Sequence, residues 1–72
     1  MDPALGLFAG NLKREREARG LSQERLAEIC GLHRTSVGLL ERRERLPRLD
    51  TLLALTRGLR LSSTCDLLRG VK

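Results

Sequence analysis

Between residues 34 and 42 the chain carries side chains whose types and spacing suit contact with a nucleic acid. At about 100° per residue, Thr35, Leu39 and Arg42 fall on one side of a helix. Gly38 lies on the same side and Arg34 lies at its edge. A guanidinium can fork onto the O6 and N7 atoms of guanine, a hydroxyl can reach a base or a phosphate, and a leucine can pack on a thymine methyl group. The pattern predicts a helix face that reads base edges, with the glycine allowing the backbone to come close.

Four arginines at the end of this face and beyond it suit contact with the phosphates of DNA. They are Arg42, Arg43, Arg45 and Arg48. The whole chain has fourteen Lys and Arg against nine Asp and Glu, a net charge of +5, and nearly all of its cations are arginine, whose planar fork matches phosphate and guanine geometry. The net positive charge favours a polyanionic partner. The alternative is that the chain is rich in arginine only because its genome is rich in G and C.

Two helices joined by a tight turn must position this face. Ser22 is expected to cap the first helix, and Gly31 to end it in the left-handed backbone that glycine adopts readily. The resulting helix-turn-helix spans about residues 22–42. A hairpin in any small helical bundle has a similar turn, but Gly38 and Leu39 on the outer face favour the DNA-reading interpretation. For Leu39 itself, a base contact and an idle surface position both stay open.

The chain as a whole predicts one all-α domain over residues 1–72, a compact five-helix arrangement. The helices are expected from Asp2 and Pro3 to about Arg19, from Ser22 to Cys30, from Arg34 to Arg42, from Asp50 through Leu59, and from Ser62 or Ser63 to about Arg69. The fourth is apolar nearly all round, which predicts a buried central helix.

The segment from about residue 59 to residue 72 has more apolar side chains than so small a domain can easily bury, and this predicts a dimerisation tail. Its candidate interface residues are Leu61, Leu67, Leu68 and Val71.

Cysteine and histidine residues form no pattern for a metal or disulfide. Cys30 and Cys65 lack Cys-x-x-Cys spacing, and the single His33 cannot complete a zinc site. His33 is expected to cap the helix that follows or to contact the DNA backbone. No nucleophile with a base and no phosphate-binding glycine loop is found, so we expect no cofactor, no metal and no enzyme. The apolar runs are too short for a membrane span, and Asp2 replaces the positive charge of a signal peptide, which predicts a cytoplasmic protein with no membrane partner.

The chain resembles the Cro and phage-repressor (XRE-type) helix-turn-helix family over about residues 8–68. The resemblance rests on Gly-Leu-Ser-Gln-x-x-Leu-Ala at 20–27, Gly-Leu-His-Arg-Thr at 31–35, Leu-Glu-Arg at 40–42 and Leu-Pro-Arg-Leu at 46–49. Within the family, the second motif looks most like the controller proteins of restriction–modification operons. The resemblance implies a lambda-repressor-like domain that binds duplex DNA as a homodimer. Unlike many relatives, this chain lacks a glycine at position 43.

Residue roles also follow from the resemblance. It implies that Arg34, Thr35, Ser36 and Leu39 read bases and that Gln23 and Arg48 hold phosphates. It further implies an ion pair between Arg16 and Glu41, which the wheel places on inner helix edges; the alternative is a solvated pair of charges. In phage repressors the positions of Glu24 and Glu28 form an acidic patch that touches RNA polymerase, whereas an ordinary pair so spaced is merely solvated.

Taken together, these features predict a sequence-specific regulator of transcription, homodimeric on a pseudo-palindromic operator and controlling a restriction–modification operon. Its recognition helices would enter successive major grooves about 34 Å apart. The alternative is an antitoxin-like or coactivator-like interaction module, in which helix five rather than Arg34 and Thr35 carries binding.

Overall fold

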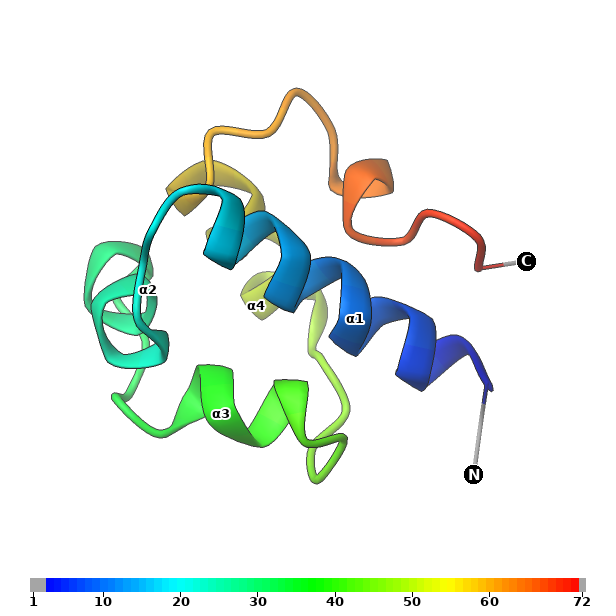
Figure 1. Cartoon of the computed structure of the whole chain (residues 1–72), viewed down its shortest axis with the longest axis horizontal. Helices are drawn as coiled ribbons and strands as arrows, with labels where there is room; N and C mark the ends of the chain where they lie inside the picture. The colour runs from blue at the N-terminus through cyan, green and yellow to red at the C-terminus, as the bar shows by residue number, and fades with distance from the viewer. Residues whose placement is uncertain (1–2, 72) are drawn as a thin grey trace.

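The computed structural model describes residues 3–71, which form four α-helices and one short 3-10 helix (Figure 1). The elements are α1 (Pro3–Ala18), α2 (Gln23–Cys30), α3 (Ser36–Glu41), α4 (Leu49–Gly58) and the 3-10 helix η1 (Thr64–Asp66). No strand occurs within these residues, so the predicted all-α class is confirmed. The helix cap expected at Asp2 lies outside the described residues.

The turn that joins α2 to α3 follows from local sequence, as expected. The Ser22 Oγ atom accepts a hydrogen bond of 3.0 Å from the backbone nitrogen of Arg25, which caps α2. Gly31 ends α2 with φ +70°, and its N–H donates to the carbonyl oxygens of Ala27 and Glu28. A residue with a Cβ atom would be strained at that φ, so glycine sets the angle between the two helices.

A single apolar core holds the helices together, and every α-helix contributes to it. The fully buried large side chains are Phe8, Leu12, Leu26, Val37, Leu40, Leu55, Leu59 and Leu67. Burying each side chain stabilises the fold by about 1.5–3 kcal/mol relative to exposure. Because the core draws on α1, the helix pair and the C-terminal segment alike, it fixes how α3 is presented to solvent.

Two of the expected helices are shorter in the structure. α3 begins at Ser36 rather than Arg34, because the backbone turns at His33: its carbonyl accepts from the Ser36 nitrogen at 2.9 Å and its ring accepts from the Thr35 nitrogen. The fifth helix is only the 3-10 turn η1, capped by the Ser63 hydroxyl. The segment is nevertheless held in place, because Leu67 belongs to the core and Leu61 and Leu68 pack against it.

α4 is not buried on all sides, which corrects the expectation of a central helix. Leu55 is buried, but Leu49 is 72% and Leu53 is 44% exposed. α2 and η1 pack against α4, and Gly58 lets α2 come close, since a Cβ atom there would clash with the Cys30 Sγ atom. Within residues 3–71, the side that carries Leu49 is left largely uncovered.

The C-terminal segment is fastened to α1, alongside which it runs in Figure 1. The buried Asn11 side chain donates from Nδ2 to the carbonyl oxygens of Leu67 at 3.0 Å and Arg69 at 2.9 Å. Leu67 is 0% exposed and belongs to the core. Its predicted role in a dimer surface is therefore wrong, because a side chain with no accessible area cannot contact a second subunit.

Candidate nucleic-acid interface

A polar hollow lies where α2 meets α3, on the face predicted to read DNA. Its lining residues are Gln23, Glu24, Arg34, Thr35, Gly38 and Arg42. They come from the first turn of α2, the turn before α3 and one side of α3. The hollow therefore brings the N-terminal end of α2 together with most of the residues that the helical wheel placed on one face.

Gly38 lies beneath the side chains that line this hollow. It is buried, and a Cβ atom on it would lie 2.9 Å from Arg42 Nη1 and 3.0 Å from Gln23 Oε1. At these distances a side chain at position 38 would force the Arg42 or Gln23 side chain to move. The glycine thus allows the Gln23 amide and the Arg42 guanidinium to lie directly over α3. The sequence predicted a close approach between DNA and α3 at Gly38. In the free protein the Gln23 and Arg42 side chains occupy that space instead.

Behind the hollow, Arg16 and Glu41 form a buried ion pair that joins α1 to α3. Arg16 Nε donates to Glu41 Oε2 at 2.7 Å, and Arg16 Nη2 donates to Glu41 Oε1 at 3.0 Å. The two side chains are 10% and 5% exposed. Arg16 Nη1 also donates to the carbonyl of Leu21 at 2.7 Å. The hydrogen bonds to Glu41 raise the pKa of Arg16, and the pair is a buried one rather than two solvated charges.

The same carboxylate also orients Gln23. Gln23 Nε2 donates to Glu41 Oε1 at 3.0 Å. An amide nitrogen has two N–H groups, so one of them stays available to an external acceptor such as a phosphate oxygen. Sequence reasoning missed this link, because nothing in the spacing of Gln23 and Glu41 signals contact between the ends of two different helices.

The predicted base readers differ in accessibility. Arg34 and Thr35 are exposed beside the hollow, and Leu39 is half-buried. Ser36 is only 8% exposed at the first position of α3. This burial does not fit the base contact predicted for Ser36, because so short a side chain with so little accessible area offers little to a base edge. Arg34, Thr35 and Leu39 remain the candidate readers.

The predicted phosphate-binding arginines are exposed, and they follow α3 in the chain from its C-cap, Arg42, to the start of α4. Arg42 pairs with Glu44, and Arg48 Nε lies 3.5 Å from Asp50 Oδ1. Arg43 adopts φ +63°, a left-handed backbone conformation that glycine adopts readily and that costs about 1–2 kcal/mol for another residue. Surface ion pairs of this kind are weak in water, so DNA phosphates can compete for these guanidinium groups.

Arg43 and Arg45 do not line the hollow. The Arg43 side chain lies against α1, where a Cβ atom on Gly6 would be 3.3 Å from its Nη1 atom. Arg45 is exposed in the loop between α3 and α4. The positive charge therefore extends from the hollow along the loop to the N-terminal half of α1.

The acidic residues of α2 are also on the surface. Glu24 lines the hollow beside Arg34, and Glu28 pairs with Arg25. Both carboxylates are exposed. Pairing with Arg25 reduces the negative charge that Glu28 offers to another protein.

Within residues 3–71, no three His, Cys, Asp or Glu side chains gather in a way that could hold a metal ion. The cysteines Cys30 and Cys65 are free thiols. No helix in this range is both long and apolar enough to cross a membrane.

Comparisons with known proteins agree with this geometry. A family model described as helix-turn-helix matches residues 12–64. Control protein C.SmaI of Serratia marcescens is 48% identical over 56 residues, which cover 78% of this chain and 67% of that protein. The crystal structure of the restriction-modification controller protein C.AhdI from Aeromonas hydrophila aligns with a TM-score of 0.83 and 40% identity over 88% of this chain and 94% of that chain. A hypothetical transcription factor, NHTF from Neisseria, aligns with a TM-score of 0.85 and 32% identity over 90% and 74%.

Proposed function

This chain belongs to the helix-turn-helix family whose model matches residues 12–64, and we propose that it regulates transcription as a homodimer whose α3 helices read a pseudo-palindromic operator. The observation that carries the proposal is the exposed hollow between α2 and α3, in which Arg34 and Thr35 stand beside Gln23. A short helix of this kind fits a major groove, where side-chain donors reach base edges.

The residues divide into readers and anchors. Arg34 can make a forked contact with guanine, Thr35 can hydrogen-bond a base, and Leu39 can pack on a thymine methyl group. Gln23 with its free N–H, and the exposed Arg42, Arg43, Arg45 and Arg48, supply phosphate contacts. Phosphate contacts fix the position of a protein on DNA without reading its sequence.

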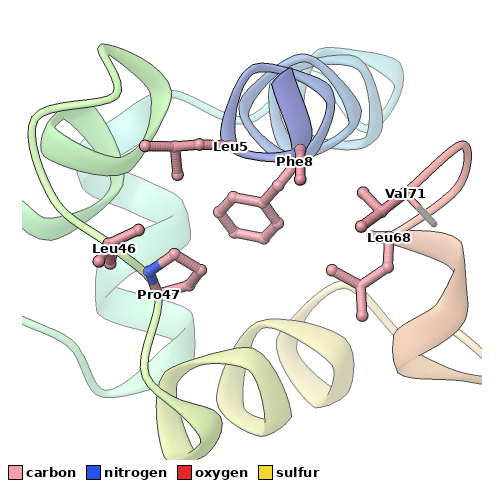
Figure 2. A pocket seen from close by; sticks show the side chains of 7 residues that line it. Leu5, Phe8, Leu46, Pro47, Leu68 and Val71 are labelled. Carbon is pink, nitrogen blue, oxygen red and sulfur yellow. The ribbon is translucent and has the colours of Figure 1, made fainter. Parts of the chain in front are cut away.

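The apolar groove on another face suits a second copy of the chain. A groove of about 280 Å³ is lined by Ala4, Leu5, Phe8, Leu46, Pro47, Leu68 and Val71. Figure 2 shows the Phe8 ring between the Leu46–Pro47 loop and the tail that carries Leu68 and Val71. Two copies that each carry +5 repel one another over most of their surface, so close association favours this groove, whose lining side chains are all apolar.

We extend the groove to the uncovered side of α4 as the dimer surface. Leu46 is 69% and Leu49 is 72% exposed, which is far more than an isolated domain needs to leave in water. A standard interface buries about 800 Å² per partner, roughly a sixth of the 4720 Å² surface of the chain. Leu68 and Val71 stay in the proposed surface, and the half-buried Leu61 packs against the core beside it.

A selection of bound sequences from random duplex DNA tests DNA reading. The Arg34→Ala variant should then bind the selected site about 1–3 kcal/mol more weakly and lose preference at one base pair. The Arg48→Ala variant should weaken binding to all sequences alike and reduce the salt dependence by about one ion. Equal behaviour of the two variants would contradict the division between readers and anchors.

Sedimentation equilibrium tests the dimer. Leu49→Glu should give monomers at micromolar concentration, because it places a charge in the proposed interface without touching the core. Ile29→Glu is a matched control, since Ile29 is also an exposed apolar residue, 44% accessible, on α2. A wild-type protein that sediments as a monomer would remove the dimer from the proposal.

The regulated genes and a polymerase contact are further parts of the proposal. The relatives C.SmaI and C.AhdI are named as control proteins, the second of a restriction–modification system, which supports a restriction–modification operon as the target. Glu24 and Glu28 are the proposed polymerase contact because both are exposed on α2. A Glu24→Lys, Glu28→Lys variant that occupies the operator and still activates would eliminate that contact.

A further inference from the structure

The turn before α3 contains a hydrogen-bonded pair formed by His33 and Thr35. His33 Nδ1 lies 3.2 Å from the backbone nitrogen of Thr35 and 2.9 Å from its Oγ1 atom. Both side chains are exposed. The ring thus closes a turn over two residues, as the side chains of Asn and Asp do in an Asx-turn.

The geometry assigns the protons in this pair. A backbone N–H can only donate, so Nδ1 must accept from it and carries no proton. The ring is then neutral, with its proton on Nε2. Because Nδ1 has no hydrogen to give, the contact with Thr35 requires the hydroxyl to donate. The single lone pair of Nδ1 is therefore shared by the N–H and the hydroxyl of one residue.

This assignment changes what Thr35 offers to a ligand. A free threonine hydroxyl both donates and accepts. With its hydrogen committed to His33, the Oγ1 atom has only lone pairs left, and it stands at the rim of the hollow beside Arg34. In the major groove the base groups that donate to such an oxygen are the exocyclic amines, N6 of adenine and N4 of cytosine.

We infer that His33 is a positioning residue that makes Thr35 a hydrogen-bond acceptor only, so that the base facing Thr35 is an adenine or a cytosine. The inference rests on the proposed function, because it needs α3 to enter a major groove. It goes further in naming the chemical group that Thr35 recognises and the residue that fixes this choice. His33 need not touch DNA.

The test compares two nearly isosteric substitutions of His33. Asn places its Oδ1 atom where the ring has Nδ1 and can accept both hydrogen bonds, whereas Leu has the same branched shape without an acceptor. Binding is measured on four duplexes that differ only at the base pair whose preference is lost in Thr35→Val. Because the His33 side chain is exposed and outside the core, circular dichroism should show all variants folded.

Wild type and His33→Asn should prefer one of the four base pairs by about 2- to 10-fold, the worth of one hydrogen bond. Because every base pair carries one exocyclic amine in the major groove, this preference should disappear when the adenine or cytosine of the preferred pair is replaced by an analogue that lacks the amine. His33→Leu should lose most of this preference, and preferences at other positions and the salt dependence should stay unchanged. A loss of helix capping alone would weaken binding to all four duplexes equally and would overturn the inference.

Three other results also contradict it. They are a wild-type affinity that stays unchanged when the exocyclic amine of the preferred pair is removed, an unchanged preference in His33→Leu, and a Thr35→Val variant that alters no position. In each case specific binding and its dependence on Arg34 persist, so the proposed function stands. If wild type selects no duplex at all, the proposed function fails and this inference fails with it.

Discussion

The buried Glu41 side chain accepts three hydrogen bonds. Substituting Glu41 is therefore the most informative single test of how α3 is held in the fold. Its two oxygens accept from Arg16 Nε, Arg16 Nη2 and Gln23 Nε2 at 2.7, 3.0 and 3.0 Å. Glu41→Ala removes all three and leaves the Arg16 charge 10% exposed without its partner. Breaking a buried pair in this way costs about 3–5 kcal/mol.

The size of this loss can be compared with the stability of the whole domain. At about 0.05–0.15 kcal/mol per residue, the 72 residues give a free energy of unfolding of roughly 4–11 kcal/mol. In a domain this small, 1 kcal/mol shifts Tm by about 4–8 °C. Glu41→Ala should therefore lower Tm by at least about 12 °C, measured by thermal circular dichroism at a fixed protein concentration.

A matched control and a double variant make the result specific. Glu28 also pairs with an arginine, but its side chain is 69% exposed, so Glu28→Ala should cost no more than about 1 kcal/mol. Replacing both partners, as in Arg16→Met with Glu41→Leu, should restore much of the stability lost in the single variant, because no charge is left unpaired. If Glu41→Ala and Glu28→Ala melt together, the buried pair does not hold α1 to α3.

Other predictions follow from the tail and the thiols. Leu67→Ala should cost about 2–5 kcal/mol in urea unfolding, as a core residue does, whereas a surface residue would change stability little. Asn11→Ala removes both N–H donors from the tail carbonyls and should cost about 1–3 kcal/mol and speed cleavage after residue 60 in limited proteolysis. Burial raises the pKa of Cys30 above its usual value, so its neutral thiol stabilises the fold fully below that value, and this contribution is lost as the pH rises through the raised pKa. A thiol reagent at pH 8 should accordingly modify the exposed Cys65 before Cys30, which single Cys→Ser variants can verify.

Local sequence was sufficient for the elements that present α3. Ser22 and Gly31 act through backbone hydrogen bonds within a few residues, and such signals are complete in the sequence. The Arg16–Glu41 pair came from family resemblance combined with a wheel that placed both residues on inner edges. The candidate base readers Arg34 and Thr35 were predicted from their position on one face of a helix expected to begin at Arg34. Both are exposed in the structure, where they lie in the turn before α3.

The features that sequence reasoning missed depend on which segments meet in space. The sequence predicted that Leu67 lies in a dimer interface, because nothing in its local sequence indicates that it packs into the core of its own domain. The exposure of Leu53 was missed because an apolar helix gives no sign of which side its neighbours cover. Asn11 did leave a signal, since it lies on the same face of α1 as Phe8 and Leu12, where a polar side chain needs a buried partner.

Hydroxyl-radical footprinting on the selected duplex tests the central claim most directly, that two copies of α3 read DNA together. The account predicts two protected patches of backbone related by two-fold symmetry, with centres one helical turn or about 34 Å apart, and loss of both patches in Arg34→Ala at the same protein concentration. A single patch, or a footprint that Arg34→Ala leaves intact, would contradict it.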